Sequence, residues 1–452
     1  MNESLLTSYS FLASLNENGD NLYNAVYIPL CKKALCQYSK QGYTTGCDEN
    51  IQSIIKNEFK IDIPLIVTRK LITAVAASLS RKSKDEFGIQ CFEKGKKFQF
   101  KSFIFNELEE SYERERRNAN ALQDSFVKYL HTKAIDGEGI PTFADFINKY
   151  RIQLSAFLCG RTDGVAVQED ITYLPHANFL KFIESTNDVL YKVVRKVFVG
   201  SIIASYIEAE IDVNAKPENK VTYYIDSRIA LNALDLQNEE DTKPTLELLK
   251  LIQETGGSVR ILNVTVSEIH SIIDSAILNF NKDNPTTSIN EACNRQKKNK
   301  TWWVGIKGQL ESYLCEKLNI EISDVSVSDI QRYSNSEDTK LLKDIWFREN
   351  AAEHDVIAYL FVRERRKQDG SKSMIQKASC WFLTSNSRLR DFNIERKING
   401  SLCEIIMPQE LTSLLFLQKP SKLTERISAI GLNELIAQTI SDEYPSKDLL
   451  NE

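Results

Sequence analysis

The chain has 452 residues, of which 42% are hydrophobic and 26% are charged, and its formal net charge is −5. This length exceeds the size of a single typical core, so we expect two or three domains of a soluble protein. The acidic balance excludes a protein coated in positive potential, although local basic patches can still bind nucleic acid.

Targeting and redox features are few. The longest apolar stretches, such as VFVGSIIASYI, are shorter than the ~20 residues that span a bilayer. The start of the chain has no basic segment of the kind that begins a signal peptide. The nine cysteines form no CxxC pair, and the four histidines lie far apart, so a zinc site is not supported. We therefore expect a cytoplasmic protein with reduced thiols and no membrane contact.

Residues 1–100 are predicted to form helices followed by a hairpin. The helical spacing is found in NAVYIPLCKKALCQYS, ENIQSIIKNEF and PLIVTRKLITAVAASLSRK, and FGIQCFEKGKKFQF alternates around a Gly-Lys turn. This order resembles a winged-helix domain whose wing carries Lys94, Lys96 and Lys97. The alternatives are ordinary surface lysines beside a turn, or a winged helix that contacts only protein.

Residues 101–215 are predicted to be a helical domain. In FNELEESYERERRNANALQDSFVKYL, acids and bases surround an apolar stripe, which is typical of a solvated helix face. The polar stretch DVNAKPENK is the best linker in the chain. Residues 421–452 are predicted to be a C-terminal helical tail.

From Val221 onward, short β-branched runs alternate with helices. These runs are VTYYID, VRILNVT, ASCWFLT and LCEIIMP. Such alternation indicates an α/β domain, which we place at residues 216–420, with a parallel sheet flanked by helices.

Four polar residues of this domain fall at strand ends or helix starts: Asp226, Glu268, Asp355 and Asn386. The carboxyl ends of parallel strands share one edge of a sheet, so residues distant in sequence can converge there. Several carboxylates in one pocket repel each other unless a divalent cation neutralises them. The pattern therefore favours a Mg²⁺ or Mn²⁺ site.

The segments YYIDSRIALNAL, NVTVSEIHSII, EHDVIAYLF and WFLTSNSRLRDF resemble, in this order, the four motifs of PIN (PilT N-terminus-like) domains. These domains are metal-dependent nucleases with a Rossmann-type sheet. The resemblance covers about residues 220–420, roughly half of the chain. It implies that Asp226, Glu268 and Asp355 bind the metal and act in phosphodiester hydrolysis. RNA is favoured over DNA as the substrate by analogy with the family alone.

The sequence departs from the family at two points. The fourth motif usually carries an Asp where this chain has Asn386, which would be a weaker ligand, and Asp391 is the nearest carboxylate that could replace it. The interval between Glu268 and Asp355 is long for the family and is interpreted as containing an insertion.

That interval includes NRQKKNKTWWVGIKG, in which Arg295, Lys297, Lys298 and Lys300 precede Trp302 and Trp303. Cations that meet phosphates and indoles that stack on bases are typical of single-stranded nucleic-acid binding. The alternative is a helix whose tryptophans lie in the core and whose lysines are solvated.

Each predicted ligand also has an ordinary structural interpretation. Asp226 would cap the following helix, Glu268 would complete a capping box with Thr265, and Asn386 would be a turn residue. His354 is expected to lie at the surface or to support a ligand rather than to act as a catalytic base.

The resulting hypothesis is a PIN-like metal-dependent nuclease whose N-terminal region guides it to a substrate or to a protein partner. The rival hypothesis is a catalytically degenerate PIN-like regulator that binds nucleic acid or protein. A third is a toxin or antiphage effector that needs an activating subunit. The oligomeric state is not indicated by the sequence.

Overall fold

The computed structural model describes residues 3–17, 22–80, 88–100, 106–158, 171–209, 220–237, 239–280, 288–345, 349–367, 378–396, 402–418 and 424–441. The chain divides into two compact units. We call Met1–Asn214 with Lys419–Glu452 the helical unit, and Ala215–Gln418 the sheet unit. Most of the predicted linker, residues 212–219, lies outside the described residues.

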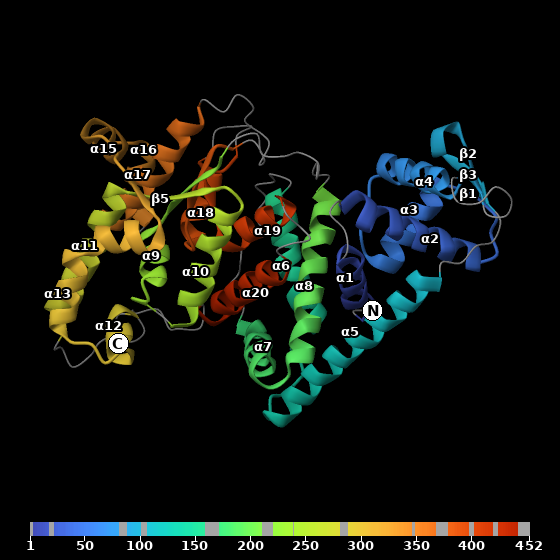
Figure 1. Ribbon diagram of the computed structural model, residues 1–452, viewed down its shortest axis with the longest axis horizontal. Coiled ribbons are helices and arrows are strands. Elements are labelled where there is room, and N and C mark those ends of the chain that lie inside the picture. The colour runs from blue at the N-terminus through green and yellow to red at the C-terminus, as the bar shows by residue number, and fades with distance from the viewer. Residues whose placement is uncertain are drawn as a thin grey trace. The chain divides into compact units, whose positions relative to one another are not determined.

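Long helices form the core of the helical unit (Figure 1). They are α1 (Glu3–Asn16), α2 (Ile28–Lys40), α3 (Asp48–Phe59), α4 (Leu65–Ser80), α5 (Asn106–Thr132), α6 (Phe143–Leu158), α7 (Leu174–Thr186), α8 (Asp188–Ala209) and α20 (Thr424–Ser441), with short turns η1 (Tyr23–Tyr27), η2 (Glu93–Gly95) and η3 (Ile171–Tyr173). Helices α1 and α8 pack closely at Gly200, because this residue has no side chain. A Cβ atom there would clash with the Tyr9 backbone. Helix α20, in the predicted C-terminal tail, packs against α7 and α8, and its Gly431 lies against the Phe198 ring.

A small antiparallel sheet lies in the same unit. Its strands β1 (Thr45–Cys47), β2 (Ile89–Phe92) and β3 (Lys97–Phe100) pair in the order β1-β3-β2, so the hairpin predicted from alternation is present. At its turn, Gly95 has a φ of 90°, and a Cβ there would clash with Thr73 and the Arg69 carbonyl oxygen. The turn therefore packs directly on α4.

The sheet unit is built on five parallel strands, which confirms the predicted α/β class with helices flanking a parallel sheet. The strands are β4 (Thr222–Ile225), β5 (Ser258–Leu262), β6 (Glu321–Ser323), β7 (Cys380–Leu383) and β8 (Ile405–Ile406), in the order β6-β5-β4-β7-β8. Strand β6 was not predicted, and it falls inside the interval interpreted as containing an insertion.

Helices surround this sheet (Figure 1). They are α9 (Ser227–Ala233), α10 (Glu239–Glu254), α11 (Asn263–Leu278), α12 (Ser288–Arg295), α13 (Lys300–Gly308), α14 (Leu310–Ser312), α15 (Val327–Ser334), α16 (Glu337–Ile345), α17 (Glu349–Arg366), α18 (Ser387–Glu395) and α19 (Pro408–Gln418), with one π-helical turn, η4 (Tyr313–Lys317). Successive side chains of β4 point to opposite faces. Tyr224 packs edge-on against Phe361 of α17, with 5.3 Å between the ring centroids, and Tyr223 lies near Gly257, beyond the end of α10.

The order in which the chain adds strands to the sheet reverses its direction once, at β4. The chain runs from β4 to β5 and β6 on one side, and then returns to β7 on the other side of β4. In open parallel sheets, ligands bind at the carboxyl ends of the strands where the order reverses. The residues that directly follow β4 and β7 therefore border the expected binding crevice. Among the described helices, none combines the length and apolar character needed to cross a bilayer.

Candidate metal centre

Asp226 lies directly after β4, at the reversal. Its Oδ1 accepts a hydrogen bond from the backbone N–H of Ser227 (2.6 Å), which makes it the N-cap of α9. Its Oδ2 accepts a hydrogen bond from Thr384 (2.7 Å), the residue that follows β7. The capping interpretation of Asp226 is therefore correct. Oδ1 also accepts a hydrogen bond from the Ser227 hydroxyl (3.2 Å). Capping does not compete with metal binding, because Oδ2 keeps a second lone pair.

Glu268 lies in the first turns of α11. The capping-box interpretation is wrong: α11 begins at Asn263, so Thr265 is inside the helix, and no side-chain cap bond is made at Leu262. The Thr265 hydroxyl instead contacts Nε2 of His354 (2.8 Å). The Glu268 Oε2 atom is buried and lies 3.2 Å from Nδ1 of His354, yet no hydrogen bond from the described part of the chain reaches it.

His354 and Asp355 belong to α17, and both are buried. The expectation of a surface position for His354 is wrong, because Thr265 and Glu268 of α11 pack onto its ring. Its Nδ1 lies 3.2 Å from Oδ1 of Asp355. Asp226, His354 and Asp355 offer ligand atoms that all lie within 4.8 Å of one another. The structure thus brings two of the predicted carboxylates, Asp226 and Asp355, together with a histidine. Glu268 is not part of this group but contacts the same histidine.

The electrostatics of this cluster reflect burial among like charges. Burial raises the pKa of Asp355 to about 7; the hydrogen bond with His354 opposes this rise and the charge of Asp226 adds to it. Burial also raises the pKa of Glu268. For His354, burial alone would lower the pKa, but the hydrogen bond with Asp355 and the charges of Glu268 and Asp355 raise it to about 9. Glu268 and Asp355 therefore resist ionisation while the imidazole of His354 holds its proton, as expected where carboxylates outnumber cations.

Asn386 lies beside the cluster but its side chain is already used. Its Oδ1 accepts a hydrogen bond from the Leu389 backbone N–H (3.1 Å) and caps α18. Its own backbone N–H donates to Thr384 Oγ1 (3.1 Å), which in turn donates to Asp226. This turn therefore orients Asp226, whether or not Asn386 is itself a ligand. Asp391 is exposed on α18, and no contact in the described residues joins it to Asp226.

The basic segment lies at a distance from this cluster. Helix α13 runs antiparallel to α11, because His270 contacts Glu311 while Asp274 pairs with Lys307 (2.6 Å). The start of α13 is therefore near Leu278, ten residues beyond Glu268, or roughly 15 Å along the helix axis. Figure 1 shows the two helices side by side.

The side chains of this segment differ in their surroundings. Arg295 pairs with Asp235 (2.5 Å), while Lys297, Lys298 and Lys300 are exposed. Trp303 is fully buried, so it cannot stack on a base in this conformation. Trp302 is half-buried and lies edge-on to Trp303. The burial of Trp303 agrees with the alternative of a helix whose tryptophan lies in the core. The exposed lysines and the half-buried Trp302 remain accessible to a ligand.

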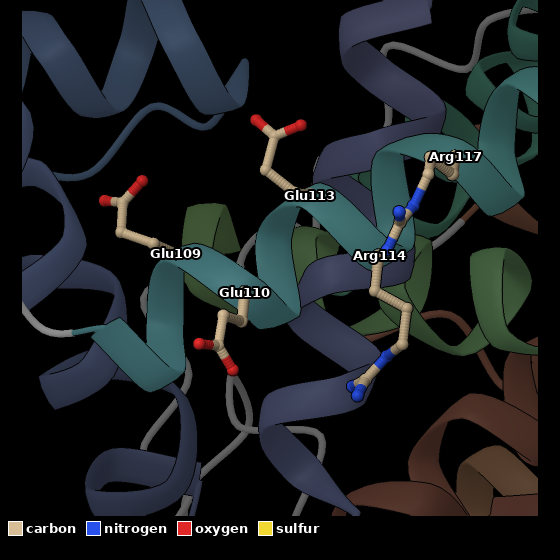
Figure 2. A pocket seen from close by; sticks show the side chains of 5 residues that line it. All are labelled: Glu109, Glu110, Glu113, Arg114 and Arg117. Atoms are coloured by element: carbon tan, nitrogen blue, oxygen red, sulfur yellow. The ribbon is translucent and has the colours of Figure 1, made fainter.

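A separate hollow of about 480 Å³ lies in the helical unit. Its lining residues are Glu109, Glu110, Glu113, Arg114 and Arg117. All come from α5, and Figure 2 shows their side chains pointing in different directions from this one helix. Glu109 is paired with Lys33 and Lys40, and Glu113 with Arg116. This agrees with the solvated helix face predicted there, and the polar groups do not converge as they do at the metal centre.

The signal that could have identified His354 is its position between Glu353 and Asp355 at the start of a helix. Its role depends on contacts with α11, about 90 residues earlier in the chain, and no local pattern predicts these contacts. In comparisons with known proteins, no family model matches this chain, and no curated protein or solved structure shows significant similarity to it.

Proposed function

We propose that this protein is a PIN-like metal-dependent nuclease that hydrolyses phosphodiester bonds, with RNA favoured over DNA. The observation that carries the proposal is the convergence of Asp226, His354 and Asp355, with Glu268 beside them, at the strand-order reversal of a parallel sheet. Among the described contacts of these three carboxylates, the only cationic partner is His354. An added divalent cation would complete the charge balance.

The residues fit an oxygen-binding cation. Asp226, Glu268 and Asp355 would hold it, with Asn386 as a candidate fourth ligand. A bound Mg²⁺ or Mn²⁺ would supply a water of lowered pKa and neutralise charge on the phosphate. The chain's own contribution is orientation: Ser227 and Thr384 fix the Asp226 carboxylate through three hydrogen bonds. The buried Oε2 of Glu268 is left without a hydrogen bond from the described residues.

Substrate recognition is proposed for two other regions. The order α2, β1, α3, α4, β2, β3 is the order of a winged-helix domain and supports that interpretation of the helical unit. Its turn exposes Lys94, Lys96 and Lys97, although Lys97 pairs with Glu93 (2.8 Å). This region would guide the enzyme to nucleic acid or to a protein partner. The exposed lysines before α13 would contact the nucleic-acid backbone.

The test is cleavage of labelled single-stranded RNA and DNA by the full chain with Mn²⁺, with and without EDTA. Glu268→Gln removes a charge from the centre. Asp274→Asn removes a charge from the far end of the same helix, where Asp274 pairs with Lys307. We expect EDTA and Glu268→Gln to abolish cleavage, and Asp274→Asn to leave it within about twofold of the wild type, because surface ion pairs contribute little. Equal activity of the two variants would refute the assignment.

One observation favours the rival function. Asn386 stands where the family usually has an acid, and its side-chain oxygen caps α18. A degenerate PIN-like regulator would bind nucleic acid or a protein partner in the presence of Mn²⁺ without cleaving either nucleic acid. An effector that needs an activating subunit would give the same result until that subunit is added.

A further inference from the structure

The ring of His354 is held at both nitrogens. Nε2 lies 2.8 Å from the Thr265 hydroxyl, and Nδ1 lies 3.2 Å from a carboxylate oxygen of Asp355 and 3.2 Å from one of Glu268. The residue is 6% exposed. A buried imidazole in this position cannot rotate away from the carboxylates without losing its contact with Thr265.

Either a proton or a metal ion at Nδ1 must balance the two carboxylate oxygens that face it. Histidines that bind a metal through one nitrogen almost always donate the N–H of the other to an oxygen acceptor. Thr265 Oγ1 can be that acceptor, and the lone pair of Nδ1 would then face two carboxylate oxygens. This contact is repulsive unless a positive charge lies between the three groups.

The spacing suits a metal ion. The ligand atoms of Asp226, His354 and Asp355 lie within 4.8 Å of one another. Two ligands on opposite sides of one ion, each about 2.1 Å away, would be ~4.2 Å apart. The 4.8 Å limit on the separations of the three ligand atoms is close to this value. The Glu268 Oε2 atom, which accepts no hydrogen bond from the described residues, lies 3.2 Å from Nδ1 of His354.

We propose that His354 is a nitrogen ligand of this centre and that it makes the centre select a divalent transition-metal ion over Mg²⁺. The inference rests on the proposed metal centre and deepens it. Imidazole nitrogen is a good ligand for first-row transition ions, whereas Mg²⁺ prefers oxygen ligands and water. Thr265 is then a positioning residue that fixes the ring and leaves Nδ1 free to bind.

The direct test is pulsed EPR of the full-length protein loaded with Mn²⁺, in which a ligating nitrogen modulates the electron spin echo. His354→Gln removes this nitrogen. His270→Gln is the matched control, because His270 lies on α11 and contacts Glu311 away from the centre. We expect nitrogen modulation in the wild type and in His270→Gln, and none in His354→Gln. His354→Gln should also bind Mn²⁺ about 10–100-fold more weakly.

Selectivity gives a second readout that needs no variant. Wild-type protein with bound Mn²⁺ should retain it against a hundredfold excess of Mg²⁺, on the order expected for a site with a nitrogen ligand. Tight Mn²⁺ binding without nitrogen modulation would overturn the inference: His354 would then carry a proton at Nδ1, and the oxygen-ligand centre would stand. Failure of the wild type to bind Mn²⁺ at all would refute the proposed metal centre itself.

Discussion

Two groups of buried acids in the sheet unit balance their charges in opposite ways. The candidate metal centre places Asp226 and Asp355 beside the imidazole of His354, which Glu268 also contacts. The second group, which we call the arginine network, consists of Asp338, Tyr359, Arg363, Arg396 and Glu404. Here Arg396 donates to Asp338 (2.7 Å), Arg363 donates to Glu404 (2.8 Å), and the Tyr359 hydroxyl donates to Asp338 (2.6 Å).

The difference lies in where the compensating charge comes from. In the arginine network, two acids meet two guanidinium groups, so the chain supplies its own cations. In the metal centre, the three acids exceed the single histidine. A buried charge left without compensation is costly, so the candidate metal centre must either keep protons on its acids, as the raised pKa values of Glu268 and Asp355 indicate, or bind a cation. Burial of carboxylates alone thus does not distinguish the two groups, while the number of cations that the chain supplies to each does.

The largest effect is expected from breaking the arginine network. Asp338→Ala removes the buried acceptor of the Tyr359 hydroxyl and a partner of Arg363 and Arg396, and we expect a loss of about 3 kcal/mol in the free energy of unfolding. Urea denaturation measures this. The control is Asp329→Ala, which removes an exposed partner of Arg332 and should cost less than ~1 kcal/mol. Similar losses in both variants would show that the network contributes no more than a surface pair.

The buried His176 can be compared with His354, because its surroundings are mainly aromatic rings. His176 lies among aromatic rings, such as Phe126 at 4.5 Å and Phe146 at 5.1 Å between centroids, and its Nε2 contacts the Pro141 carbonyl oxygen (2.9 Å). Burial lowers the pKa of His176 to about 4, although the contact with Pro141 opposes this shift. No carboxylate of the described residues makes a hydrogen bond to its ring, and the charge of Asp145 only partly opposes the effect of burial, so His176 is neutral at pH 7.

The free energy of unfolding depends on pH through the lowered pKa of His176. Because the pKa of His176 is lower in the folded state than the usual 6.5, the unfolded chain binds the proton better. The stability is therefore fully present above pH 6.5 and is lost as the pH falls towards 4, by up to about 3 kcal/mol. Urea denaturation from pH 7 to pH 4 should show a smaller loss in His176→Phe than in the wild type. The exposed His131→Gln should keep the wild-type slope; equal slopes in all three proteins would contradict the prediction.

Much of the sheet unit could be predicted because its strands are continuous apolar runs. The runs that contain β4, β5, β7 and β8 all form parallel strands, and the residue after β4 lies at the centre as expected. Strand β6 has three residues, Glu321–Ser323, of which only Ser323 is buried. A run so short and polar carries no periodic signal, and its pairing with β5 comes from tertiary packing.

The side-chain roles that could not be predicted depend on contacts between helices. His354 is buried because Thr265 and Glu268, three residues apart on one face of α11, contact its ring. The helical spacing around Trp302 and Trp303 predicts a helix, but only the packing of α13 against α11 decides which indole is buried. Sequence patterns therefore indicated the carboxylates of the centre but not the histidine among them.

The metal centre should respond to charge removal in the opposite sense to the arginine network. In EDTA, Asp355→Asn relieves repulsion with Asp226 and Glu268, so the melting temperature should hold or rise. Wild-type protein should gain about 2.7 kcal/mol of stability at a Mn²⁺ concentration one hundred times its Kd. The variant should lose most of this gain, which thermal unfolding with and without Mn²⁺ would measure. A large loss of stability in EDTA together with an intact Mn²⁺ response would mean that Asp355 is a structural acid like Asp338.

The smallest expected effect concerns Asn386, a neutral residue that caps α18 beside the carboxylates of the candidate metal centre. Asp and Asn cap helices about equally well, so Asn386→Asp should keep the cap of α18 while adding a fourth carboxylate beside the centre. We expect the metal-free protein to lose a few tenths of a kcal/mol, roughly 0.5 at most, through repulsion, and Mn²⁺ to bind severalfold more tightly in calorimetric titration. The matched control is Asn299→Asp, because Asn299 caps α13 through the same side-chain bond, to Trp302 at 3.1 Å, away from the carboxylates. If the two variants bind Mn²⁺ and unfold alike, Asn386 is only a helix cap, and the centre consists of Asp226, Glu268, Asp355 and His354.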